Sequence, residues 1–246
     1  MTGAGDWLTL RVTGADDVAV ITLDRPGMRN ALNAQMRAEL TRAVGDAGTW
    51  ARAVVITGAG AAFCSGQDLG GSTSLADTDL ERALRDEYLP MIGAIRACPV
   101  PVIAAVGGAA AGDGASLALA ADLTIAAESA VFTFTFTRIG LIPDAGATWL
   151  LPRLIGAQRA MGAMLLGEPV SAAQAADWGM IWQSVPDASF EETWRDLAAR
   201  IAAGPAAAHR ALKKAMAASP EAGLEEQILT EAGLQGECAG SRDFRE

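Results

Sequence analysis

The chain has 246 residues, of which 51% are hydrophobic and only 5% aromatic, enough for one large domain with a sizeable core. Lys and Arg number 19 against 29 Asp and Glu, so the formal net charge is −10, which argues against nucleic acid or an anionic membrane as a partner. A small anionic ligand is compatible with this charge, because a few arginines and backbone N–H groups can bind phosphates locally.

The three cysteines, Cys64, Cys98 and Cys238, lie far apart and form no CxxC pair or metal-binding spacing. We therefore expect reduced thiols, no metal site and a cytoplasmic location. The first residues lack the basic and apolar regions of a signal peptide. The most apolar stretch, residues 97–112, contains prolines and glycines and is too short to span a membrane, so we expect no membrane segment.

The first half of the chain alternates candidate strands and helices. Residues 7–13 and 17–23 alternate apolar and polar positions around a turn-like segment at 14–16, which predicts a hairpin. Asn33 is a candidate N-cap for a helix that runs to about Asp46. After it we predict, in chain order, a strand at 52–58, a helix at 77–97 ended by prolines, a strand at 102–106, a helix near 114–121 and a strand at 122–126.

From residue 156 onward the pattern is mainly helical. We predict helices near 157–166, 171–177, 190–203 and 205–217, with a short strand at 181–185. The alternation that precedes this part is typical of an α/β domain with parallel strands. We therefore divide the chain into a core over residues 1–190 and a C-terminal helical region over residues 191–246.

Three glycine-containing loops each follow a predicted strand, at residues 62–69, 107–114 and 140–146. Ligands of α/β proteins bind at such strand ends, and glycine lets a backbone approach a ligand closely. Two N–H groups from two loops, helped by the N-terminus of the helix near Gly114, could stabilise an enolate-like oxygen on a thioester carbonyl. Composition alone is equally compatible with tight turns that bind nothing.

Four motifs, in this order and spacing, resemble the crotonase (enoyl-CoA hydratase/isomerase) superfamily. They are DRP at 24–26 with NAL at 30–32, AFCSGQDL at 62–69, the run at 106–122, and GLIPDAGATWLLPRLIG at 140–156. The resemblance extends from about residue 8 to residue 246. It implies a spiral of repeated ββα units, a C-terminal trimerisation region, and a homotrimer or dimer of trimers. It also implies an acyl-CoA thioester substrate, with coenzyme A as part of the substrate and no separate cofactor.

The resemblance assigns roles to residues of the first two loops. The backbone N–H groups of Gln67 and Asp113 match the oxyanion donors, although Asp113 departs from the usual glycine and its side chain must point away from the oxyanion. The Ser65 backbone matches an adenine-binding position. Arg25 or Arg29 could approach the CoA phosphates, or could simply be solvated. The other residues expected along the substrate are Gly66, Asp68, Leu69, Gly112, Phe136 and Leu141.

The catalytic positions favour an isomerase over a hydratase. Hydratases of this family use two glutamates to activate water, and the matching positions hold Ser116 and Phe136. Ser116 is either a small helix residue or a polar group of the pocket. Asp144 matches the acid that moves a proton in double-bond isomerases, and also the nucleophilic aspartate of a dehalogenase. By pattern alone, Asp144 could instead cap a helix beginning at Ala145.

The combination most resembles the 1,2-epoxyphenylacetyl-CoA isomerase branch of phenylacetate degradation. In this reading Asp144 removes a proton and returns it to another carbon, and an apolar pocket raises its pKa so that it is a stronger base. The candidates for that pocket are Phe132, Phe134, Phe136, Leu141, Ile142 and Trp149. The alternatives are a hydratase, an aspartate-nucleophile dehalogenase or thioester hydrolase, and a non-catalytic acyl-CoA binder. The single histidine, His209, excludes a conventional Ser-His-Asp triad unless it reaches the site.

Overall fold

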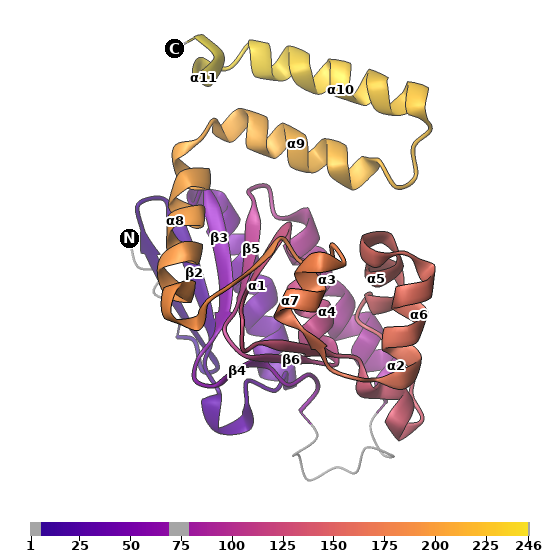
Figure 1. The fold of residues 1–246 in the computed structure, drawn as a ribbon. Helices are drawn as coiled ribbons and strands as arrows, with labels where there is room; N and C mark the ends of the chain where they lie inside the picture. Colours follow the sequence, from indigo (N-terminus) through magenta and orange to yellow (C-terminus); the bar gives the residue numbers. More distant parts are fainter. Residues whose placement is uncertain (1–5, 69–78, 246) are drawn as a thin grey trace.

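The computed structural model describes residues 6–68 and 79–245, and these form two sheets wrapped by helices (Figure 1). The larger sheet has six strands in the order β1-β2-β3-β5-β7-β10, and the smaller has four in the order β4-β6-β8-β9. The strands are β1 Leu10–Ala15, β2 Val18–Leu23, β3 Ala53–Gly58, β4 Ala62–Cys64, β5 Val102–Val106, β6 Ala109–Ala111, β7 Leu123–Ala127, β8 Val131–Thr133, β9 Val170–Ser171 and β10 Gln183–Val185.

From β3 to β8, successive strands go alternately to the two sheets, which makes this part of the chain a spiral of ββα units. β3, β5 and β7 lie side by side in the larger sheet, while β4, β6 and β8, which directly follow them, lie side by side in the smaller one. All of these neighbours pair in parallel. The predicted α/β fold with parallel strands and ββα repeats is therefore confirmed.

The N-terminal hairpin has the predicted strands but a different turn. The strands pair from Leu10 with Leu23 to Ala15 with Val18, so β1 continues into the predicted turn at 14–16 and β2 begins at Val18. Asp16 and Asp17 form the two-residue turn, with φ of 51° and 60°. Two successive left-handed residues match the twist of the flanking strands, and aspartate tolerates that conformation.

The helix after the hairpin packs its apolar side against the larger sheet. α1 spans Ala34–Trp50, and the Asn33 side chain accepts a hydrogen bond from the Met36 backbone N–H, as expected for an N-cap. The helix runs past the predicted end at Asp46. Its last turn is held by packing, because Gly48 lies so close to Pro99 that an added Cβ would be 2.9 Å from the proline Cδ.

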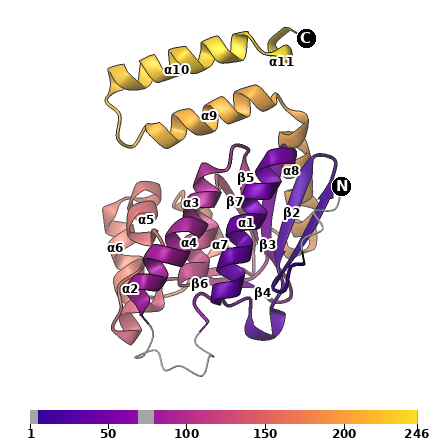
Figure 2. The same cartoon turned by 180° about the vertical axis from the view of Figure 1, so that it is seen from behind.

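Helices cover the two faces of the larger sheet unequally, as the view from behind shows (Figure 2). One face forms a large core with α1 and α3, whereas the other is covered by α8 through Trp194, Ala198 and Ala202. The helical segments between residues 26 and 203 are η1 Pro26–Met28, α2 Leu80–Ala83, η3 Leu84–Tyr88, α3 Leu89–Ala97, α4 Asp113–Leu119, η4 Thr135–Ile139, α5 Ala147–Ile155, α6 Ala157–Leu166, α7 Ala172–Asp177, η5 Asp187–Ser189 and α8 Phe190–Ala203.

The C-terminal helices form a layer beyond the core. α9 (Ala206–Ala218) and α10 (Leu224–Ala239) lie side by side in opposite directions, and α11 (Arg242–Arg245) follows (Figure 1). Lys213 ties α9 to the core, since its ammonium contacts Asp122 Oδ2 at 2.6 Å and the Ile95 and Val100 carbonyl oxygens at 3.2 Å. Several large apolar side chains of this layer are exposed, namely Leu212, Met216, Leu224, Ile228, Leu229 and Phe244.

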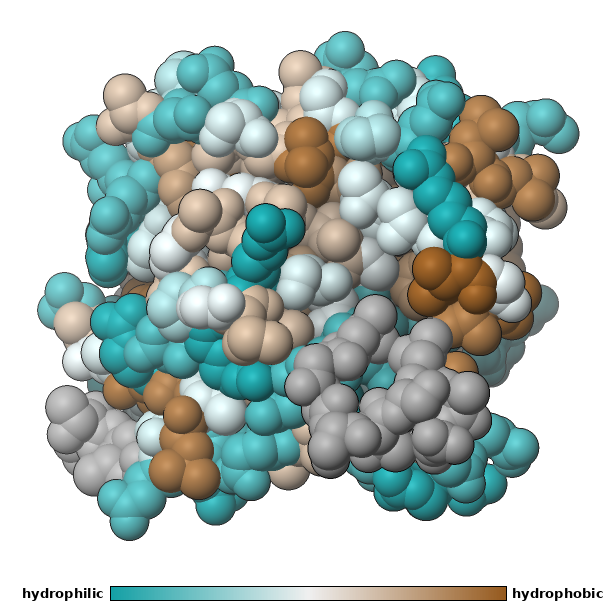
Figure 3. All heavy atoms as spheres, turned by 90° about the horizontal axis from the view of Figure 1, so that it is seen from below, coloured by the Kyte–Doolittle hydropathy of each residue, from teal (hydrophilic) through white to brown (hydrophobic). Residues whose placement is uncertain are grey.

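The opposite, lower face of the molecule is more mixed in character. There, apolar side chains form separate groups among hydrophilic ones (Figure 3). Within the described residues, no helix has the length and apolar character needed to cross a membrane.

Candidate active site

Two of the predicted glycine loops meet directly, and glycine is what lets them meet. β4 pairs with β6, which places the loop after β4 against the turn that opens α4. A Cβ added to Gly114 would lie 2.3 Å from the Cys64 carbonyl oxygen. One added to Gly66 would lie 2.8 Å from the Ala111 carbonyl oxygen and 3.3 Å from the Asp113 nitrogen. Side chains at these positions would push the loops apart.

Each loop presents a backbone N–H that secondary structure does not use. Gln67 lies opposite Leu32 in an isolated parallel bridge. The hydrogen bonds of this bridge involve the residues on either side of Gln67, because Leu32 N–H donates to the Gly66 oxygen and Asp68 N–H donates to the Leu32 oxygen. The Gln67 N–H therefore faces away from Leu32. Asp113 is the first residue of α4, where an N–H has no acceptor within the helix. The predicted pair of oxyanion donors is thus available on adjoining loops.

A buried polar cluster supports the first of these loops. The Asn30 amide nitrogen donates to the carbonyl oxygens of Ala59 and Ala62 at 2.9 and 2.8 Å. Arg25 Nη1 contacts the Ala31 oxygen at 2.6 Å and Asp68 Oδ2 at 2.7 Å. The Arg25 guanidinium is therefore engaged beside Gln67, and a role with CoA phosphates stays a prediction for it.

The other residues predicted along the substrate have varied surroundings. Arg29 is exposed and has a left-handed backbone. Ser65 is half-buried beside Gly66. Leu69 lies outside the described residues. The binding roles of all three stay predictions.

The third loop brings Asp144 to the start of α4. Ser116, which is fully buried on α4, donates a hydrogen bond from its hydroxyl to the Asp144 backbone oxygen at 3.0 Å. The residues after Asp144 turn sharply, with φ of 48° at Ala145 and 89° at Gly146. α5 begins at Ala147 without a side-chain N-cap, so the alternative role of Asp144 as a cap is wrong. Ser116 is a polar group that positions the Asp144 loop.

The side chains of Asp113 and Asp144 form a carboxyl pair at this junction. Tyr88 donates a hydrogen bond from its hydroxyl to Asp113 Oδ2 at 3.0 Å, which turns the Asp113 side chain into the protein. Burial, followed by the hydrogen bond and the charge of Asp113, raises the pKa of Asp144 to about 9. At neutral pH the pair therefore holds a proton, because two adjacent carboxylates repel each other.

Tyr88 is itself part of a buried chain of polar groups. It is 1% exposed, and the Arg37 guanidinium lies 4.6 Å from its ring centre. Arg37 also donates to Glu87 and to the Leu32 carbonyl oxygen. Burial and then the charge of Asp113 raise the pKa of Tyr88, so its hydroxyl stays protonated and donates. Tyr88 is the only tyrosine of the chain.

Part of the apolar set predicted to line the pocket is buried, and its role as a lining stays a prediction. Phe132 and Phe134 are fully buried, and Phe136 packs against Gly112, where an added Cβ would lie 3.6 Å from the Phe136 ring. Leu141 is half-buried and its N–H donates to the Phe136 oxygen. Ile142 was predicted to line the pocket as well, but its side chain is 76% exposed.

Trp149 is also a weak candidate for this lining. Its ring is 37% exposed and lies near the guanidinium groups of Arg96 and Arg153. It therefore faces charged groups and not a closed apolar pocket.

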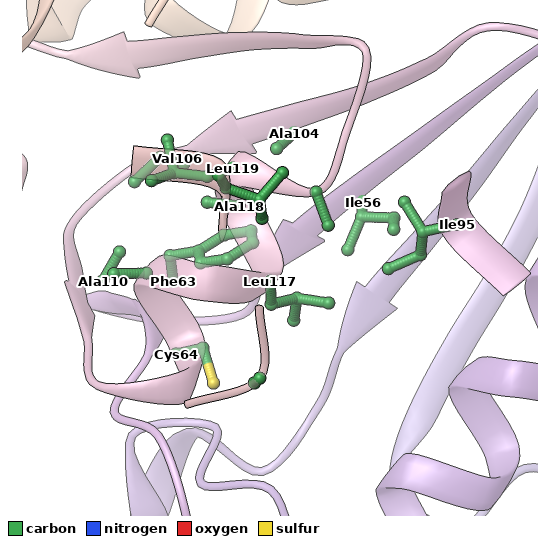
Figure 4. Packing of buried hydrophobic residues seen from close by; sticks show 14 of the residues in the cluster. Ile56, Phe63, Cys64, Ile95, Ala104, Val106, Ala110, Leu117, Ala118 and Leu119 are labelled. Carbon is green, nitrogen blue, oxygen red and sulfur yellow. The ribbon is translucent and has the colours of Figure 1, made fainter. Parts of the chain in front are cut away.

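The core directly behind the loops is closely packed (Figure 4). Phe63 and Cys64 of β4 lie beside Leu117 and Leu119 of α4, and all four are buried. Burial raises the pKa of the Cys64 thiol to about 12, so it is not a nucleophile at neutral pH. Among the described residues, no group of His, Cys, Asp and Glu side chains has the arrangement of a metal site.

The sequence analysis did not identify Tyr88 or a side-chain role for Asp113. An aspartate where the family usually has glycine was a signal for Asp113, because a buried charge needs a partner. Tyr88 gave no signal of its own, since a tyrosine on a helical stripe is usually core.

Comparisons with known proteins agree with this geometry. A family model described as Enoyl-CoA hydratase/isomerase matches residues 13–246. A protein of Rhodobacter capsulatus named probable enoyl-CoA hydratase is 56% identical, over 97% of this chain and 92% of its own. The 1,2-epoxyphenylacetyl-CoA isomerase of Escherichia coli is 41% identical, over 93% and 89%. The crystal structure of an enoyl-CoA hydratase from Bacillus anthracis superposes with a TM-score of 0.90 at 33% identity, over 97% and 93%.

Proposed function

The chain belongs to the enoyl-CoA hydratase/isomerase family, and we propose that within it this protein is an acyl-CoA isomerase. It would move a proton, and with it a double bond, on an enoyl-CoA or ring-epoxyphenylacetyl-CoA thioester. The observation that carries the proposal is that the Asp144 carboxyl is a hydrogen-bonding neighbour of Asp113. It lies beside the two loops in which the N–H groups of Gln67 and Asp113 have no acceptor among residues 6–68 and 79–245. Ser116 and Phe136 stand where the hydratases of the family carry carboxylates.

In the proposed reaction the thioester oxygen accepts hydrogen bonds from the N–H groups of Gln67 and Asp113. The Asp144 carboxylate takes a proton from a substrate carbon, so that a C–H bond breaks and an O–H bond forms. The electron pair moves into the thioester carbonyl, and the two donors stabilise the resulting enolate. The O–H bond then breaks as a C–H bond forms at another carbon. Protons and electrons balance, and Asp144 ends as it began.

The raised pKa makes the Asp144 carboxylate a stronger base once it has formed, so turnover should rise with pH as Asp144 loses its proton. The buried Phe136 and half-buried Leu141 support it by limiting water near the carboxyl. Ser116 has its hydroxyl on the Asp144 carbonyl, so it supports the loop in place of activating water.

Replacing Asp144 by asparagine tests the proposal. We expect isomerisation of a 3-enoyl-CoA or of epoxyphenylacetyl-CoA to fall by about 10²–10⁴-fold, the usual contribution of a general acid–base group. Binding of a saturated acyl-CoA, measured by calorimetry, should change by less than about threefold, because the oxyanion donors are main-chain groups. Asp196→Asn, on the exposed side of α8, is the matched control. Full activity in Asp144→Asn, or an equal loss of binding and turnover, would refute the role.

A hydratase is the second candidate, favoured by the name of the 56% identical relative. It is distinguished by incubation with crotonyl-CoA, in which loss of the enoyl absorbance reports water addition. Hydration that is faster than isomerisation would replace the isomerase proposal. A covalent acyl or aryl adduct on Asp144, detected by mass spectrometry, would instead indicate a nucleophilic mechanism.

We also propose that the protein is a cytoplasmic homotrimer or dimer of trimers. The exposed apolar side chains of α9 and α10 support this assembly, because they would be covered by a neighbouring subunit. The free cysteines, Cys64, Cys98 and Cys238, agree with a reducing compartment. Light scattering on the purified protein measures the assembly size, and a monomer at micromolar concentration would contradict it.

A further inference from the structure

The proposed function uses only the backbone N–H of Asp113 and gives no role to its buried carboxyl. Its side chain is 3% exposed, and one oxygen, Oδ2, accepts the hydrogen bond from Tyr88. Its other oxygen, Oδ1, is buried, as is Oδ1 of Asp144, and neither has a donor among residues 6–68 and 79–245. Buried oxygens of this kind are costly unless a hydrogen bond satisfies them.

A single proton between the two side chains would satisfy both. As two carboxylates, Asp113 and Asp144 are only acceptors and repel each other, whereas one proton turns one of them into a donor. The side chains are hydrogen-bonding neighbours, and Ser116 of α4 holds the Asp144 backbone at the same junction. The hydroxyl of Tyr88 then stabilises the charge that the pair retains.

We propose that Asp113 is a positioning residue that shares one proton with Asp144, so that the pair sets the pH at which Asp144 can accept a proton from the substrate. Its effect on catalysis rests on the proposed function, while the pair itself does not. Asp113 would thus act twice, through its N–H on the thioester oxygen and through its carboxyl on Asp144. A substitution of the side chain separates these two roles, because it leaves the N–H in place.

The other titratable groups around the pair come from three elements. Tyr88 of η3 contacts Asp113, and Arg37 of α1 lies behind it with its partner Glu87. Burial and the charge of Asp113 raise the pKa of Cys64 of β4, so its thiol is protonated at neutral pH. Among the described groups, only Arg37 is a cation close to the pair, and Glu87 partly neutralises it. The proton of the pair is therefore not displaced by a direct salt bridge.

Two substitutions should move the pH profile in opposite directions. Asp113→Asn removes the neighbouring charge and places an amide donor near Asp144, so the rising limb of kcat should move to lower pH by about 1–3 units. Tyr88→Phe removes the donor that stabilises the charged pair, so the same limb should move to higher pH. A general loss of structure would not produce opposite shifts. Asp196→Asn, on the exposed side of α8, should leave the limb unchanged.

Infrared spectroscopy measures the pair without requiring turnover. We expect wild-type protein at pH 7 to show the C=O band of a buried protonated carboxyl, Asp144→Asn to lack it, and the band of Asp113→Asn to disappear at a lower pH than that of the wild type. If the wild type isomerises no thioester but shows this band, the proposed function fails and the pair stands. If the limb and the band of Asp113→Asn match the wild type, or if Tyr88→Phe shifts the limb in the same direction as Asp113→Asn, the shared proton is refuted.

Discussion

Replacing Gly66 by alanine should separate the two loops that carry Gln67 and Asp113. Gly66 has a φ of 89°, and an added Cβ would lie 2.8 Å from the Ala111 oxygen. A left-handed conformation costs an L-residue about 1–2 kcal/mol, and an overpacked site costs about 1–3 kcal/mol more. The free energy of unfolding should therefore fall by about 2–5 kcal/mol, a large part of the 5–15 kcal/mol typical of folded proteins.

Thermal unfolding followed by circular dichroism measures this loss. For a chain of this size each kcal/mol lowers Tm by about 2–4 °C, so we expect a decrease of roughly 4–20 °C. Gly27→Ala is the matched control, because an added Cβ there has no atom within 4 Å and φ is not left-handed. Turnover should fall in Gly66→Ala even well below its Tm, since the oxyanion donors would be displaced. If Gly66→Ala is as stable and active as Gly27→Ala, the close approach of the loops is not required.

Two further predictions concern stability. Lys213→Met should lower the free energy of unfolding by about 1–3 kcal/mol, because it leaves Asp122 and two carbonyl oxygens without the ammonium. Lys214→Met, on the exposed side of α9, should change it by less than about 0.5 kcal/mol. Equal urea midpoints for the two variants would contradict a stabilising role of Lys213 between α9 and the core. The folded-state pKa of Asp144 lies above its unfolded value, so its contribution to stability is full below pH 3.8 and is lost as pH rises towards about 9. Asp144→Asn should therefore gain Tm relative to wild type across that range, and parallel Tm curves would show that the carboxyl is not perturbed.

The long elements of the fold could be predicted because each is long enough to show its signal in the sequence, either an N-cap followed by a helical period or a run of apolar residues. Asn33 marked the start of α1, and the apolar runs of β3 and β5 marked buried strands. The short strands β4 and β6 could not be predicted, because segments of three residues, Ala-Phe-Cys and Ala-Ala-Ala, are too short to show an alternation. They exist because the neighbouring ββα units hold them side by side. α5 entered the prediction only as an alternative, a helix beginning at Ala145, since Pro152 interrupts its helical pattern.

The C-terminal region was only partly predicted. α9 was expected almost residue for residue, but α10 was not predicted as a separate helix. Its apolar residues Leu224, Ile228 and Leu229 are exposed in the isolated chain. A helix in the proposed subunit contact would lack the contrast between one buried and one solvated side that a single-chain pattern depends on.

The candidate site could be located from its motifs but not assembled from them. Gln67, Asp113 and Asp144 were each identified, yet the sequence separates Asp113 from Asp144 by 31 positions and contains no sign that their side chains touch. The contact depends on two local features, the hydroxyl of Ser116 that fixes the Asp144 backbone and the hydroxyl of Tyr88 that turns Asp113 inward. Ser116 was noticed only as the residue at a catalytic position of the family, and Tyr88 was not identified at all. The Tyr88 hydroxyl holds the Asp113 carboxyl inside the protein, away from the N–H that would hold the thioester oxygen, and the Ser116 hydroxyl holds the Asp144 loop beside it.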